Sequence, residues 1–153
     1  MPEKSEISQA KETVFRLFRY RPRSEKEIID KLRAKNIAPE IVTDVIAYFR
    51  KIQLLDDRLF ARGWIASRLR KPFGLYRIKQ ELKIKGVPEN IIQQECAQAL
   101  IHYDEKEALK GLCQKRIKQY KHLPKLKARR RLYAYLARRG FSAETIGPVI
   151  KDI

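Results

Sequence analysis

Carboxylate side chains are the first candidates for chemistry in this chain. Acidic residues stand side by side at Asp56-Asp57 and at Asp104-Glu105, and Glu81 lies far from both pairs in the sequence. General acid–base catalysis needs two such groups that converge on one substrate. Both pairs instead fall just before expected helices, where a carboxylate accepts backbone amide hydrogen bonds and meets the positive end of the helix dipole. Helix capping therefore explains the pairs better than catalysis does.

Histidine, glycine and cysteine give no stronger indication of an enzyme. His102 and His122 have no partner at metal-ligand spacing, and the six glycines are scattered and form no phosphate-binding loop. Cys96 and Cys113 each lie in an apolar helical stripe, which predicts buried, reduced thiols. We therefore expect no catalytic residues, no metal and no cofactor, and a protein that acts by binding.

Lysine and arginine supply the chemistry that this sequence has in abundance. The formal net charge is +17, which favours a polyanionic partner such as nucleic acid, an acidic membrane surface or an acidic protein groove. Residues 106–153 carry 14 basic and 3 acidic groups, whereas residues 1–55 carry 12 and 8. The C-terminal third should therefore be the strongest electrostatic surface.

The basic residues form two clusters that are the candidate binding sites. The first comprises Arg68, Arg70, Lys71, Arg77, Lys79, Lys83 and Lys85, and the second comprises Lys115, Arg116, Lys118, Lys121, Arg129, Arg130, Arg131, Arg138 and Arg139. Phe73 and Tyr76 lie within the first cluster, and Tyr133 and Tyr135 within the second, so stacking on bases is one interpretation. Solvated helix faces and packed aromatic rings are the alternative interpretation.

A six-residue unit recurs three times and reveals the elements that carry these clusters. It consists of a leucine, two variable residues, a base, Gly or Asn, and an apolar residue, and it begins at Leu32, Leu82 and Leu136. An apolar residue precedes each leucine by four positions, which is helical spacing. The Gly or Asn suits the positive φ that ends many helices. Each unit therefore predicts the end of one helix and the start of the next.

A further helix precedes each pair, over 10–20, 58–69 and 105–120. The predicted fold class is therefore all-α, with nine helices in three tandem three-helix repeats over 8–53, 54–102 and 103–153. Ser24 and Asp104 begin capping boxes that support these boundaries. One repeat of ~50 residues buries too little surface to be very stable alone, so we expect neighbours to pack end to end into an elongated modular array. Trp64 is expected in the core, and Gly63 at a close approach of two helices.

The middle repeat also carries a specific motif. It combines a leucine and two aspartates, a Phe-Ala pair, an aromatic residue, a turn with glycine, and a helix: Leu55-Asp56-Asp57, Phe60-Ala61, Trp64, Gly74, and Arg77-Ile78-x-x-Glu81-Leu82-x-x-Lys85-Gly86-Val87. This motif resembles the signature of the RecX family. Segments 23–32 and 138–142 resemble the same family, and the resemblance covers roughly residues 12–152.

The resemblance implies a function in recombination, DNA repair and the SOS response. RecX-like proteins have three tandem three-helix repeats, lie along the groove of the RecA–DNA filament, and inhibit its ATP hydrolysis, strand exchange and coprotease activity. The implied partners are the RecA filament and single- or double-stranded DNA, contacted directly or through the filament. Basic residues such as Arg68, Arg77 and Lys85 stand at matching positions.

Charge alone supports a different prediction, a stand-alone basic helical DNA-binding module. A nuclease or another enzyme is the third hypothesis, and metal-dependent turnover that disappears on mutation of Asp56 and Asp57, with the fold intact, would be needed to support it. No apolar run approaches the ~20 residues of a membrane span, so we expect no membrane partner. We expect a cytoplasmic monomer.

Overall fold

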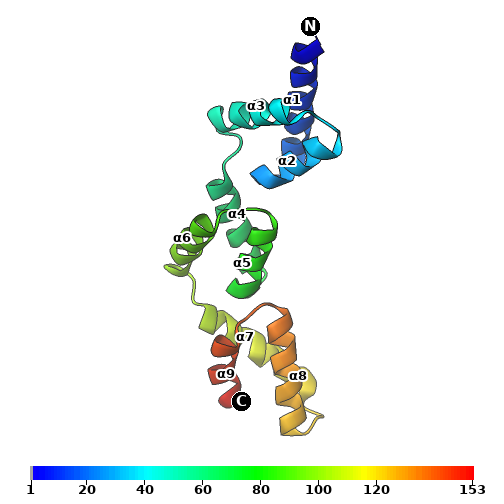
Figure 1. Ribbon diagram of the computed structural model, residues 1–153. Coiled ribbons are helices and arrows are strands. Elements are labelled where there is room, and N and C mark those ends of the chain that lie inside the picture. The colour runs from blue at the N-terminus through cyan, green and yellow to red at the C-terminus, as the bar shows by residue number, and fades with distance from the viewer. Residues whose placement is uncertain (1) are drawn as a thin grey trace. The chain divides into compact units, whose positions relative to one another are not determined.

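The computed structural model describes residues 2–153, and within this range it contains nine α-helices, one 3-10 turn and no strand (Figure 1). The elements are α1 (Pro2–Tyr20), α2 (Glu25–Ala34), α3 (Pro39–Lys51), α4 (Asp57–Arg70), α5 (Leu75–Ile84), α6 (Glu89–Leu100), α7 (Glu105–Ile117), η1 (Lys118–Tyr120), α8 (Lys125–Arg138) and α9 (Ala143–Lys151). The predicted all-α fold of three-helix repeats is confirmed.

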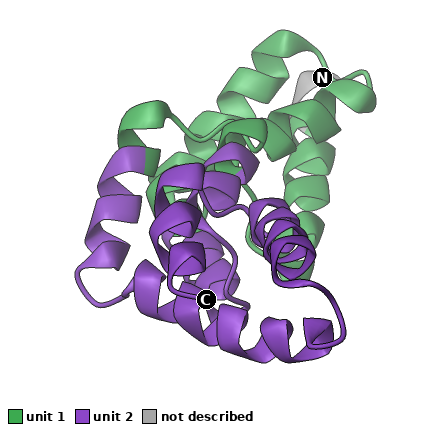
Figure 2. Ribbon diagram, turned by 90° about the horizontal axis from the view of Figure 1, so that it is seen from below, with its two compact units in different colours: residues 1–61, 82–92 green, residues 62–81, 93–153 purple. Residues whose placement is uncertain are grey.

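The chain divides into two compact units, which Figure 2 shows in different colours. The first comprises residues 1–61 and 82–92, and the second comprises residues 62–81 and 93–153. Each unit thus contains one terminal repeat together with part of the middle repeat. The predicted repeat boundaries and the predicted elongated array remain predictions.

The core of the first unit lies among α1, α2 and α3. Ile28 and Leu32, four residues apart on α2, are fully buried, as the repeat predicts. Phe49 of α3 is also fully buried, and its ring centroid lies 4.8 Å from that of Phe15 in an edge-to-face arrangement. Such aromatic pairs stabilise a core beyond their buried area, by about 1 kcal/mol.

The core of the second unit lies among α7, α8 and α9. Leu132 and Leu136 of α8 correspond in the repeat to Ile28 and Leu32, and they are buried to the same extent. Cys113 and Phe141 pack in the same cluster, and burial raises the pKa of the Cys113 thiol. Cys113 and Cys96 are both buried, as predicted.

Local signals at the helix ends act as the sequence predicts. Ser24 forms a capping box with Glu27, and the side chains of Asp104 and Ser142 accept amide hydrogen bonds at the starts of α7 and α9. The Asn or Gly of each repeat unit has positive φ: 58° at Asn36, 78° at Gly86 and 91° at Gly140.

Three expectations require correction. The first helix begins at Pro2 instead of near Ala10. Trp64 is only partly buried because its indole nitrogen donates a hydrogen bond of 2.9 Å to the Glu81 carboxylate, which keeps the ring at the surface. Gly63 is exposed, and nothing lies within 4 Å of the place a Cβ would occupy, so no close helix contact explains it.

Candidate functional site

The second basic cluster lies on α7, η1 and α8 of the second unit. Most of its side chains are exposed, and none forms an ion pair within the described part of the chain: Lys115, Arg116, Lys118, Lys121, Arg129, Arg130, Arg131, Arg138 and Arg139. Helix α8 buries Ala128, Leu132 and Leu136, which leaves its opposite face to the bases. The predicted electrostatic surface is therefore accessible to a partner and carries its full charge.

The outer face of α8 also exposes apolar groups between its bases. Leu126 is 63% exposed and Tyr133 is 41% exposed, and Arg130 lies between them at helical spacing. Arg129 differs from its neighbours because its Nη2 donates to the backbone carbonyl of Lys151 at 3.2 Å, which ties α8 to the end of α9. Tyr135 faces the interior side and carries the Arg116 guanidinium 4.4 Å from its ring centroid.

The structure separates the members of the first basic cluster. Lys85 pairs with Glu27 at 2.7 Å, Lys83 pairs with Glu89 at 3.3 Å, and Lys79 donates to the amide oxygen of Gln93 at 3.3 Å. Arg68 and Arg77 both bind Glu81. Arg70 and Lys71 are exposed, and neither has an acidic partner among the described residues. The cluster is therefore not one continuous surface of free cations.

The ion pair of Lys85 belongs to a contact between neighbouring repeats, which we name the first joint. There residues 21–27, the turn before α2 and its first residues, meet Lys85 and Gly86, which directly follow α5. The hydroxyl of Ser24 donates to the carbonyl of Lys85 at 2.6 Å. Burial raises the pKa of Glu27, but hydrogen bonds from Arg21, Lys85 and the Ser24 amide outweigh burial and hold that pKa at about 2. Glu27 is therefore ionised, and its negative charge is balanced by Arg21 and Lys85.

The equivalent contact in the second unit, the second joint, joins the start of α5 to the end of α8. The amide of Gly74 donates to the carbonyl of Arg139 at 2.9 Å. A Cβ on Gly74 would lie 2.1 Å from the carbonyl oxygen of Gly140, and a Cβ on Gly140 would lie 2.0 Å from Cβ of Arg77. The two backbones approach so closely that this joint requires both glycines.

An arginine cluster surrounds Phe73 at the second joint. The guanidinium carbons of Arg77, Arg139 and Arg68 lie 4.4, 4.7 and 5.4 Å from the centre of the Phe73 ring. Arg139 also donates to the carbonyls of Pro72, at 3.3 Å, and of Lys71. The structure thus brings together members of both predicted clusters, and gives Phe73 a role as their platform.

Sequence reasoning missed a second function of the acidic pairs. Asp56 caps its own helix, but Asp57 accepts the backbone amide of Glu25 at 2.9 Å, and Glu105 accepts that of Leu75. Both acceptors therefore serve the second helix of the preceding repeat. Burial raises the pKa of Asp57 and of Glu105, and these hydrogen bonds oppose that rise. The available signal was that the acidic pairs occur at the start of repeats 2 and 3, which follow another repeat, and not at the start of repeat 1.

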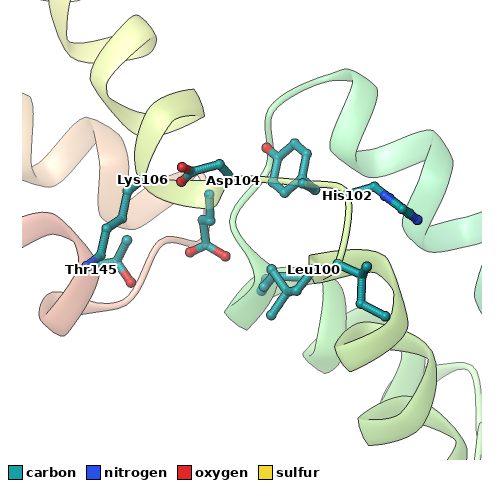
Figure 3. A pocket seen from close by; sticks show the side chains of 9 residues that line it. Leu100, His102, Asp104, Lys106 and Thr145 are labelled. Atoms are coloured by element: carbon teal, nitrogen blue, oxygen red, sulfur yellow. The ribbon is translucent and has the colours of Figure 1, made fainter.

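A pocket of about 610 Å³ in the second unit lies where α6 leads into α7. Figure 3 shows Lys106 and Thr145 on one side of it and Leu100 and His102 on the other. Its carboxylates are already occupied, since Asp104 caps α7 and Glu105 binds the Leu75 amide. In residues 2–153 no group of three ligand-type side chains is placed to hold a metal ion. Nor does any helix in this range have the length and apolarity of a membrane span.

Within residues 2–153, nine helices in repeated threes and a basic surface without ion pairs define the class of basic helical-repeat proteins. Family profiles of RecX match three consecutive segments: the first three-helix domain at 10–49, the second at 56–94 and the third at 104–150. The chain belongs to the RecX family.

Individual relatives agree with this assignment. The regulatory protein RecX of Prosthecochloris aestuarii is 34% identical over 139 residues, which cover 87% of this chain and 85% of the relative. That of Streptomyces lividans is 32% identical over 143 residues, which cover 92% and 75%. The crystal structure of RecX from Lactobacillus salivarius superposes with a TM-score of 0.83 at 25% identity, over 97% of each chain.

Proposed function

We propose that this protein binds the RecA–DNA filament and inhibits its ATPase, recombinase and coprotease activities. The observation that carries the proposal is a basic surface on α7 and α8, without ion pairs in the described structure, in a chain of the RecX family. A filament of protein and DNA presents a repeating array of negative charge, and several weak basic contacts along it add by proximity. In this proposal the protein acts as a cytoplasmic monomer by binding, without turnover of its own.

The direct test is DNA-dependent ATP hydrolysis by preformed RecA filaments, titrated with this protein at fixed moderate salt. We expect inhibition at substoichiometric protein and no ATPase activity of the protein alone. No inhibition, together with ordinary salt-sensitive DNA binding, would leave the second candidate, a stand-alone DNA-binding module, which the net charge favours.

Charge reversal on α8 tests the surface itself. Arg130→Glu with Arg131→Glu should raise the concentration needed for half inhibition, because both side chains are exposed and make no ion pair in the described chain. Arg129 is left in place because it binds the carbonyl of Lys151. The double reversal Lys31→Glu with Arg33→Glu on α2 changes the charge equally at exposed positions outside both clusters, and serves as the control.

A further inference from the structure

The arginine cluster of the second joint has more positive charge than the joint itself needs. Within the described chain, Glu81 is the carboxylate that binds it, at 2.9 Å from Arg68 and 3.0 Å from Arg77. Three guanidiniums against one carboxylate leave two positive charges uncompensated around one aromatic ring. Like charges held this close repel one another, so an anion would stabilise the arrangement.

The first joint shows that the fold does not demand these cations. In the first joint, Glu27 occupies the repeat position that corresponds to Arg77, and Lys85 occupies the position that corresponds to Arg139. Glu27 and Lys85 form an ion pair of 2.7 Å, and beside them the side-chain hydroxyl of Ser24, in place of a backbone amide, donates to the Lys85 carbonyl. Arg21 also binds Glu27 at 2.7 Å, so this joint closes with one surplus positive charge, whereas the second joint holds two. The additional charge at the second joint, gathered around an aromatic ring, calls for another explanation.

Exposed groups beside the cluster indicate which anion it fits. Tyr76, next to Arg77 on α5, is 61% exposed, although its equivalent at the first joint is Lys26, which pairs with Asp30. Arg70 and Lys71 add exposed positive charge just before Phe73. An exposed ring one residue along the helix from Arg77 suits a base next to the bound phosphates, whereas a single carboxylate would use neither the ring nor the outlying charges.

We propose that the arginine cluster and Tyr76 form a binding site for single-stranded nucleic acid. Arg77 and Arg139 contact backbone phosphates, and Tyr76 stacks on a base. The inference deepens the proposed function and rests on it for DNA as the polyanion. In this inference the nucleic acid binds at the second joint, and the recombinase protein binds at other surfaces of the chain.

The test exchanges one joint for the other. The double variant Arg77→Glu with Arg139→Lys gives the second joint the acid and base of the first, a pair that this fold already accommodates. Binding to a labelled oligothymidine strand is followed by fluorescence anisotropy over a range of salt concentrations. We expect weaker binding and a slope of log affinity against log salt that flattens by roughly 0.7 for each phosphate that the variant no longer binds.

A second variant and a control keep the result interpretable. Tyr76→Ala, at an exposed position, should bind the strand roughly tenfold more weakly at an unchanged salt slope, because it removes stacking and no charge. Lys31→Glu matches the charge change of the double variant at an exposed site on α2 and should keep the wild-type slope. Circular dichroism checks that each variant is folded.

The outcomes separate this inference from the proposed function. A wild-type slope in the double variant would overturn the inference, and so would a variant that keeps the slope but no longer inhibits RecA, since its partner would then be an acidic protein surface. If the wild-type protein does not inhibit RecA but the double variant still flattens the slope, the inference is supported and the proposed function is refuted.

Discussion

At the first joint the hydroxyl of Ser24 donates to the carbonyl of Lys85, and at the second joint the amide of Gly74 donates to the carbonyl of Arg139. In each joint a carboxylate at the start of the following repeat accepts the first amide of the second helix. The side chains around these shared contacts differ. The first joint pairs a partly buried acid, Glu27, with Arg21 and Lys85, whereas the second gathers three arginines around Phe73.

The difference shows how a repeat can keep a hydrogen bond to an equivalent backbone carbonyl and change the side chains around it. Because backbone groups and small residues hold both joints closed, the neighbouring side chains are free to differ. One joint uses that freedom for a stabilising ion-pair network, and in our account the other uses it for binding.

The largest expected effect comes from closing the space at the second joint. Gly140→Ala should lower the free energy of unfolding by about 3 kcal/mol, because φ is positive and the new Cβ meets Cβ and backbone of Arg77. Gly86→Ala should cost less, about 1–2 kcal/mol, since its Cβ meets only the Lys26 side chain. Urea unfolding followed by circular dichroism measures both.

Gly111→Ala is the matched control for these substitutions. Gly111 lies within α7 with nothing within 4 Å of an added Cβ, so alanine should stabilise the protein by about 1 kcal/mol through helix propensity. Equal unfolding midpoints for Gly140→Ala and Gly111→Ala would contradict the close approach at the second joint.

The ion-pair network of the first joint should appear as acid sensitivity. The pKa of Glu27 is lowered from 4.5 to about 2 in the folded state, so its ionised form stabilises the protein above about pH 5, and this contribution is lost as the pH falls toward 2. The contribution is roughly 3 kcal/mol at neutral pH. Unfolding midpoints of wild type and Glu27→Gln should therefore differ at pH 7 and converge in acid. A constant difference across this range would show that Glu27 is not the responsible group.

A smaller and equal effect is expected from the carboxylates that the two joints share. Asp57→Ala and Glu105→Ala each leave a helix amide without its acceptor and should cost about 1 kcal/mol. Asp57→Asn keeps an acceptor and removes a charge that burial disfavours, so at pH 7 it should not destabilise the protein. Because the folded pKa of Asp57 is raised, any advantage of the asparagine should vanish as the pH falls below that pKa. Thermal unfolding at two pH values measures this.

Local sequence signals were sufficient to predict the helices, but they could not predict contacts between residues far apart in the chain. The capping of α2 by Ser24 and the helix-ending positive φ of Gly140 involve residues a few positions away, so sequence spacing was sufficient to predict these two roles. The acceptor role of Asp57 joins residues 32 apart, and nothing in the local sequence specifies it. Trp64 looked like a core residue by spacing, and its bond to Glu81 shows why it is not.

At the candidate site, too, the charge could be predicted from the sequence and the pairing of the side chains could not. Counting charges predicted a basic C-terminal surface, which the structure shows as exposed side chains without ion pairs in the described range. Counting could not tell Lys85, which Glu27 neutralises, from Arg139, which stacks on Phe73. That distinction depends on which repeat ends meet, and only the folded chain reveals it.

Our central claim is that the first joint serves stability and the second serves binding. The most direct measurement is the half-inhibition concentration for RecA filament ATPase, compared between Glu27→Gln and Arg77→Gln at neutral pH. Each variant replaces one charge with an amide at a corresponding position. The account predicts that Arg77→Gln raises this concentration severalfold, with little loss of stability because its ion pair is half exposed, and that Glu27→Gln leaves it unchanged. Equal inhibition by both variants, or a larger loss in Glu27→Gln, would contradict it.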